Sequence, residues 1–228
     1  MSDRYYRLVT FVINICPKPL RGLFISKAKQ DKNTQYTTLK DYLVFRKQDI
    51  DTLKSRNKIS TDQCDHIFPS DGIVDIQTWD ITLLSALLRG LFKTELDCSE
   101  IRCIDEITTT RNDLQHISGT ECIEAEQFDL LWENLKRAVL KLAECAGAPE
   151  KSSIEEEIKK SLTENMPNLG DVLRTWHKVL YIQLSLQNKK LEEELKKQSS
   201  KIRNVGATSA KSKTILLKAS RKTQGRSV

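Results

Sequence analysis

Three side chains near the middle of the chain have the types and spacing to act on a phosphate group. Arg111, Asn112 and His116 lie in the segment RNDLQH. An arginine can stabilise negative charge that develops on phosphorus, and a histidine can act as general acid or base near neutral pH. The asparagine could orient the ring or contact a ribose. If the attacking group is the RNA's own 2′-hydroxyl, no metal is needed. These three residues are therefore the candidate catalytic set, although an isolated Arg-x4-His pair also arises by chance in many helices.

The helix that must carry this set is predicted over residues 98–116. With about 100° per residue, Arg111 falls near the centre of the apolar stripe formed by Ile104, Ile107 and Leu114. A guanidinium buried without partners is strongly unfavourable. We therefore expect Arg111 to pair, to reach the helix edge, or to face a partner subunit or an anionic ligand.

The remaining sequence predicts an all-α protein. Eight Gly and five Pro in 228 residues are too few for the tight turns of a β-sandwich or barrel. Pro17 is expected to end the first helix, and a capping box of Ser153 and Glu156 is expected to open a later one. The three tryptophans lie in apolar helical stripes and are expected in the core. Further helices are predicted at 4–16, 19–30, 38–46, after a Ser60/Gln63 capping box, after an Asp80 cap, at 124–146 and at about 170–204.

Charge divides the chain into three blocks. Residues 1–58 carry a net +8, residues 59–150 a net −11 and residues 151–228 a net +9, and residues 196–228 hold ten basic and no acidic residues. This pattern predicts an acidic body with a disordered basic arm. The arm either contacts nucleic acid or is a solvated or targeting tail. The RNA-binding candidates in the arm are Lys211, Lys213, Arg221 and Lys222. The expected domains are a helical domain at 1–148, a linker helix with a coiled-coil segment at 149–204, and the tail at 205–228.

A short coiled-coil seam is predicted in the linker helix. Leucines and polar residues alternate at steps of three and four, with Asn188 at a position where a polar residue specifies register. The pattern favours self-association or a protein partner, and a solvated helix with a weak stripe is the alternative. The seam residues are Leu184, Asn188, Leu191, Leu195, Gln198 and Ile202.

Cysteine and histidine spacing gives no sign of a metal centre. The six cysteines form no CxxC pair, and the three histidines stand far apart, so no metal and no cofactor is expected. Reduced thiols favour a cytoplasmic protein, with a nuclear location as the alternative. The sequence has no run of 18 apolar residues, so it predicts no membrane span, and no membrane partner is expected.

Four segments resemble blocks of HEPN domains, in the group named after the DAZ-interacting zinc-finger ubiquitin ligase. Together they cover residues 4 to about 148 in order. They are RYYRLVTFVINICPKPLRGLF (4–24), QCDHIFPSDG (63–72), TWDITLLSALLRGLF (78–92), and TRNDLQHIS (110–118) followed by FDLLWENLKRAVLKL (128–142).

The resemblance implies a HEPN-like helical bundle, often a homodimer, in which the Arg-x4–6-His motifs of two subunits face each other. Arg111, Asn112 and His116 match the motif, and Arg111 would face the dimer cleft. Many HEPN domains are metal-independent endoribonucleases, whereas others bind RNA or serve as non-catalytic modules. Close members have five residues between Arg and His, but this chain has four, which shifts His116 by one helical step and bears on activity.

Two functions follow from the residues and the resemblance together. The first is a non-catalytic module that binds RNA or protein, in an animal protein of the innate-immunity type. The second is a metal-independent endoribonuclease that acts as a dimer. The acidic block favours the first, because it repels RNA phosphates except where Arg111 and the basic arm compensate.

Overall fold

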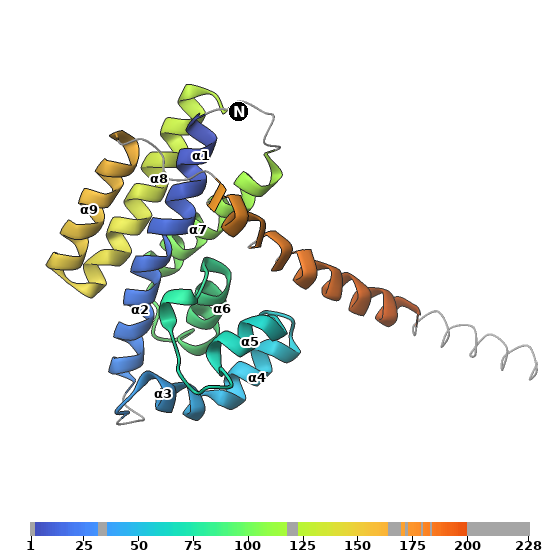
Figure 1. Cartoon of the computed structure of the whole chain (residues 1–228). Helices are drawn as coiled ribbons and strands as arrows, with labels where there is room; N and C mark the ends of the chain where they lie inside the picture. Colours follow the sequence, from blue (N-terminus) through green and yellow to red (C-terminus); the bar gives the residue numbers. More distant parts are fainter. Residues whose placement is uncertain are drawn as a thin grey trace, which may run out of the picture. The chain divides into compact units, whose positions relative to one another are not determined.

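The helices of this chain were obtained from a computed structural model, which describes residues 3–31, 36–117, 123–163 and 170–199 apart from 172, 179 and 183 (Figure 1). Every element in these ranges is a helix, which confirms the all-α prediction. The chain divides into two compact units, Met1–Leu186 and Gln187–Val228. The elements are α1 Asp3–Thr10, the π-helix η1 Phe11–Ile15, α2 Pro17–Gln30, α3 Leu39–Phe45, α4 Lys47–Ser55, α5 Thr61–Ile67, η2 Ile76–Thr78, α6 Ile81–Leu91, α7 Cys98–His116, α8 Ala125–Ala143, η3 Glu144–Ala146 and α9 Ala148–Thr163. The described residues of 170–199 are helical as well.

The first helix passes through Pro17, so the prediction that it ends there is wrong. The Cys16 amide donates to the Phe11 carbonyl at 3.1 Å, which is the i to i−5 bond of a π turn. Proline has no N–H to donate and clashes with the carbonyl four residues back in a regular helix. The wider turn precedes Pro17, which then occupies the first position of α2, where a missing N–H is harmless.

The resulting helical run, Asp3–Gln30, is long and apolar enough to cross a membrane by length and composition alone. Of its most apolar 18-residue stretch, 67% is buried inside the protein. A core helix passes the same composition test, and this run is packed as one.

Local capping explains several helix starts as predicted. Ser60 and Gln63 form the expected capping box at α5. Asp80 caps α6, and its carboxylate accepts from the Leu83 amide at 2.7 Å. Helix α7 has the predicted bounds and begins at a second capping box, made by Asp97 with Glu100, which was not predicted.

Two other expectations fail for local reasons. Gly147 adopts φ +110°, which turns the chain between η3 and α9. Helix α9 therefore starts at Ala148, and Ser153 lies inside it rather than at its cap. Helix α4 was not predicted, because Ile50 is its one fully buried side chain and its periodicity is correspondingly weak.

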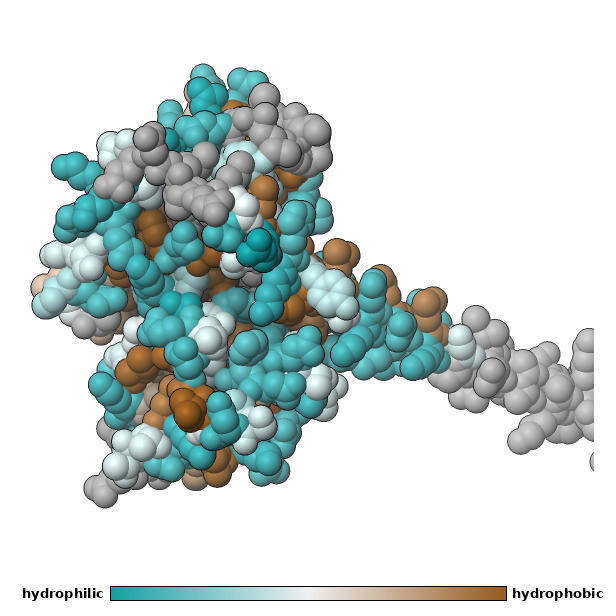
Figure 2. All heavy atoms as spheres, viewed as in Figure 1, coloured by the Kyte–Doolittle hydropathy of each residue, from teal (hydrophilic) through white to brown (hydrophobic). Residues whose placement is uncertain are grey.

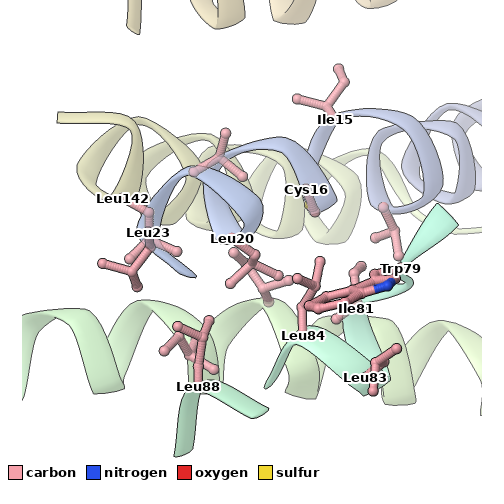
Figure 3. Packing of buried hydrophobic residues seen from close by; sticks show 14 of the residues in the cluster. Ile15, Cys16, Leu20, Leu23, Trp79, Ile81, Leu83, Leu84, Leu88 and Leu142 are labelled. Carbon is pink, nitrogen blue, oxygen red and sulfur yellow. The ribbon is translucent and has the colours of Figure 1, made fainter. Parts of the chain in front are cut away.

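The core lies around α2, which packs against α6 on one side and α8 on another. Figure 3 shows Leu20 and Leu23 of α2 facing the leucines of α6. The centroid of the Phe24 ring lies 5.4 Å from the ring centroids of both Trp79 and Phe92. All three tryptophans are buried as predicted, and the visible face of the compact unit is mainly hydrophilic (Figure 2).

Close packing of α4 on α6 yields a stability prediction at Gly90. A Cβ placed there would lie 2.5 Å from Cδ1 and 3.0 Å from Cγ of Leu53. We expect Gly90→Ala to lower the free energy of unfolding by about 1 kcal/mol, because overpacking outweighs the gain in helix propensity. In a Leu53→Ala background the clash is gone, and the same change should raise the free energy of unfolding by up to about 1 kcal/mol.

Urea unfolding of the four proteins in this cycle measures both values. If Gly90→Ala changed the free energy of unfolding in the same direction in both backgrounds, the packing of Gly90 against Leu53 would be contradicted.

Candidate functional site around Arg111

Helix α7 buries the arginine that the sequence places on its apolar stripe. The Arg111 side chain is 3% exposed, and Ile104, Ile107 and Leu114 are fully buried on the same stripe. The predicted position of Arg111 among apolar neighbours is therefore confirmed. An arginine in this setting needs compensation for its lost hydration.

Arg111 lines a cleft of about 470 Å³. Its rim is polar and exposed, whereas Trp79 and Trp176 contribute buried aromatic surface. The other lining residues come from η1, α2, the η2–α6 turn, α6 and the helical segment 170–186, and they are Val12, Ile13, Asn14, Pro17, Lys18, Arg21, Gln77, Thr78, Asp80, Ile81 and Thr175.

Asp80 links the buried cation to the cap of α6. Its carboxylate accepts from the Leu83 amide at 2.7 Å and from Gln63 Nε2 at 3.3 Å. Burial lowers the pKa of the Arg111 guanidinium, and the negative charge of Asp80 opposes that shift. Since arginine remains protonated in proteins, the cleft holds a poorly hydrated cation that would gain energy from a second anion.

Two further cations enter the cleft from α2. Arg21 donates through Nη2 to the carbonyls of Gln77 at 2.7 Å and Trp79 at 3.0 Å. Lys18 pairs with Glu157 of α9 at 2.5 Å. These contacts fasten α2 to the η2–α6 turn and to α9, so both cations are held at the edge of the cleft.

A second hollow continues the basic surface along α2. It has a volume of about 450 Å³, shares Lys18 and Arg21 with the first, and reaches Lys29. These three residues are spaced to lie on one face of a helix. Glu150 is the carboxylate among its lining residues. The two hollows therefore form a basic track that ends at Arg111.

His116 does not share the cleft with Arg111. The His116 side chain is exposed and Asn112 is half-buried, and neither lines the cleft. Five residues along a helix correspond to about 140° between the directions of Arg111 and His116. Elements of its own chain bury Arg111, and its implied position at a dimer cleft stays a prediction.

The remaining sequence candidates fall elsewhere. Lys211, Lys213, Arg221 and Lys222 lie outside the described residues. Within the described part of the chain, no group of three or more His, Cys, Asp or Glu side chains could hold a metal ion.

The roles of Lys18, Arg21 and Trp176 in the cleft were not predicted from the sequence. The three-residue spacing of Lys18 and Arg21 in the basic first block was the available signal. Nothing in the local pattern connected Trp176 to them.

Comparison with known families gives a match over most of the helical body. A family model described as DZIP3/hRUL138-like HEPN matches residues 36–168, more than half of the chain. The matched region contains Arg111, Asn112 and His116 but excludes α1, α2 and the segment 170–186. No curated protein and no solved structure matches the chain.

The coupling between Asp80 and Arg111 yields a second prediction. Asn caps a helix about as well as Asp, so Asp80→Asn removes charge and keeps the α6 cap. We expect it to lower the free energy of unfolding by about 1–3 kcal/mol, the range for charges several ångströms apart at an effective dielectric constant near 20. Asp80→Ala should lower the free energy of unfolding by about 1 kcal/mol more, because it also removes the α6 cap.

Urea unfolding at neutral pH measures these values, and Arg111→Met provides the reference background. There, Asp80→Asn should cost less, because only the interaction of the Asp80 charge with Arg21 remains. An equal loss in both backgrounds would show that the Asp80 charge does not stabilise Arg111.

Proposed function

We propose that this chain, which belongs to the DZIP3/hRUL138-like HEPN family, is a non-catalytic module that binds RNA through the Arg111 cleft. One observation carries the proposal. Arg111 is buried in a cleft with two other cations, while His116 is exposed and outside it. The site has the charge to hold a phosphate, and the motif histidine is not beside it.

The chemistry of the cleft fits a phosphate oxygen. A guanidinium offers paired N–H donors that match phosphate geometry and is weakly hydrated. At the Arg111 cleft, burial has already removed much of that hydration, so an incoming anion displaces little water from the cation. Lys18 and Arg21 lie at the edge, where Glu157 pairs with Lys18 and Asp80 is the lining carboxylate.

Catalysis by the same residues would need a different arrangement. A general acid or base must come within hydrogen-bond reach of the proton that it transfers. His116 diverges from Arg111 by about 140° on α7.

A polyanion fits this surface better than a single small anion. Cations continue from Arg111 along α2 to Lys29, and the sequence adds ten basic residues in 196–228. Successive phosphates of one strand could occupy such a track. The expected reduced state of the cysteines is compatible with a cytoplasmic place of action.

We further propose that the module self-associates through its C-terminal seam. In the second unit, Leu191 is 57% exposed and Leu195 is 62% exposed. Leucines at this spacing gain energy when a partner helix covers them. Self-association would place two RNA sites in one particle and raise the apparent affinity.

Removal of the Arg111 charge should weaken RNA binding. We expect Arg111→Met to raise the dissociation constant for a labelled single-stranded RNA by about ten- to a hundredfold, the equivalent of about 1.5–3 kcal/mol for one charge-assisted contact. The slope of affinity against salt concentration should fall by about one. The matched control is Arg102→Met, an equal change at an exposed position of the same helix.

Fluorescence anisotropy over a range of salt concentrations measures both quantities, and thermal melting confirms that each variant is folded. Equal affinities for the Arg111 and Arg102 variants would refute the assignment of RNA binding to the cleft.

The chain should leave RNA intact. We expect no cleavage of structured or single-stranded RNA in EDTA by the wild type, because His116 lies outside the Arg111 cleft. Gel analysis beside Arg111→Ala and His116→Ala tests this, with light scattering to establish the oligomeric state. Cleavage that both substitutions abolish would instead establish the metal-independent endoribonuclease.

A further inference from the structure

The helical segment 170–186, here called the strap helix, is part of the HEPN-containing body although the family match ends at residue 168. Its Trp176 side chain is 2% exposed and belongs to the hydrophobic core, and Leu173 and Leu180 pack partly buried against that core. In Figure 1 the start of this orange helix lies beside α1. The strap helix is therefore docked on the same elements that position Arg111.

Trp176 is joined to the motif helix by two hydrogen bonds. Its indole Nε1 donates to the Tyr5 hydroxyl at 3.1 Å, and that hydroxyl donates to the Leu114 carbonyl at 3.4 Å. Leu114 lies in the last turn of α7, where carbonyls have no partner within the helix. Tyr5 of α1 thus donates to a carbonyl at the end of α7, three residues beyond Arg111, and accepts from the strap helix.

The strap helix also forms one wall of the cleft. Thr175 and Trp176 line it together with Arg111. Because Arg111 is 3% exposed, a phosphate in solution cannot reach its guanidinium until some wall moves.

The walls differ in how firmly they are held. Helices α2, α6 and α7 contribute many buried side chains to the main core cluster, whereas Trp176 is the one described residue of the strap helix buried in that cluster. Ile182 and Leu186 of the strap helix are buried outside it. Segments with few buried contacts open at the lowest free energy. The strap helix is therefore the wall that moves most readily.

We propose that the strap helix is an autoinhibitory lid on the Arg111 cleft, that Trp176 is its latch, and that RNA phosphate competes with the docked strap. The inference rests on the proposed RNA-binding function for the identity of the ligand. When only a fraction of molecules is open, the apparent dissociation constant exceeds the intrinsic one by the inverse of that fraction. Weakening the latch should then tighten RNA binding.

Arginine-specific labelling of the full chain tests the lid without RNA. Phenylglyoxal would be applied to the wild type, Trp176→Ala and Tyr5→Phe, and the rate at each arginine read by peptide mass spectrometry. His177→Ala, an exposed neighbour of the latch, is the matched control. Arg102 is the exposed reference on α7, and Arg46, held by Asp31 at 3.1 Å, reports unfolding of the body.

We expect the Arg111 rate relative to Arg102 to rise at least tenfold in Trp176→Ala and severalfold in Tyr5→Phe, with Arg46 and the His177→Ala control unchanged. An unchanged Arg111 rate in both variants overturns the lid. If the labelling rates of Arg46 and Arg111 rise together in Trp176→Ala, that variant has unfolded. Tyr5→Phe then decides the question alone, because it keeps the ring and removes only the hydroxyl.

Anisotropy with fluorescein-labelled oligouridine then tests the competition in the same variants. We expect affinity to rise by the factor by which Arg111 labelling rises. Faster labelling with unchanged affinity would show that the strap covers Arg111 but that RNA is not the ligand, which refutes the competition and the proposed function while leaving the lid. Weaker binding by Trp176→Ala, with Arg111 labelling raised, would make Trp176 an RNA contact and overturn autoinhibition.

Discussion

A guanidinium held out of water constrains the arrangement of the helices around it. Burial lowers the pKa of Arg111, and the Asp80 carboxylate counters this effect. Asp80 can stand there because α6 starts at that residue, so one side chain caps a helix and stabilises a cation. The start of α6, the direction of α7 and the position of α2 are therefore linked. A shift in any of them would change the electrostatic environment of a charge that cannot be neutralised by losing its proton.

The long N-terminal helical run is the second structural requirement, because one element supplies contacts to several parts of the site. Tyr5 accepts from the strap helix, and Arg21 holds the η2–α6 turn. Lys27 pairs with Glu100 near the start of α7 at 2.8 Å. The π turn before Pro17 adds a residue without breaking the run, and so sets the rotation of α2 relative to α1. The run thus connects both ends of α7 to the cleft.

The parts of this structure that were predictable from sequence depend on local interactions. The bounds of α7 and the burial of Arg111 follow from capping and helical period, and the divergence of His116 follows from the same 100° step. The continuation through Pro17 was not predictable, because a π turn is a rare local solution. The cleft itself escaped prediction because it joins residues far apart in the chain: Trp176 meets Tyr5 across 171 positions, and no periodic pattern connects them.

Charge distribution explains why a closed cleft suits this chain. Residues 59–150 carry a net −11, which disfavours the approach of nucleic acid, and this charge and the cations of α2 and Arg111 are both screened over about 8 Å at physiological salt. An open, unliganded cleft would hydrate the Arg111 guanidinium and expose the Trp176 indole to water, an unfavourable exchange for the indole. The docked strap helix avoids that exposure. RNA then binds only if the free energy gained from contact between phosphate and Arg111 exceeds the free energy gained from burying Trp176. The strap helix therefore helps to set the affinity of the site.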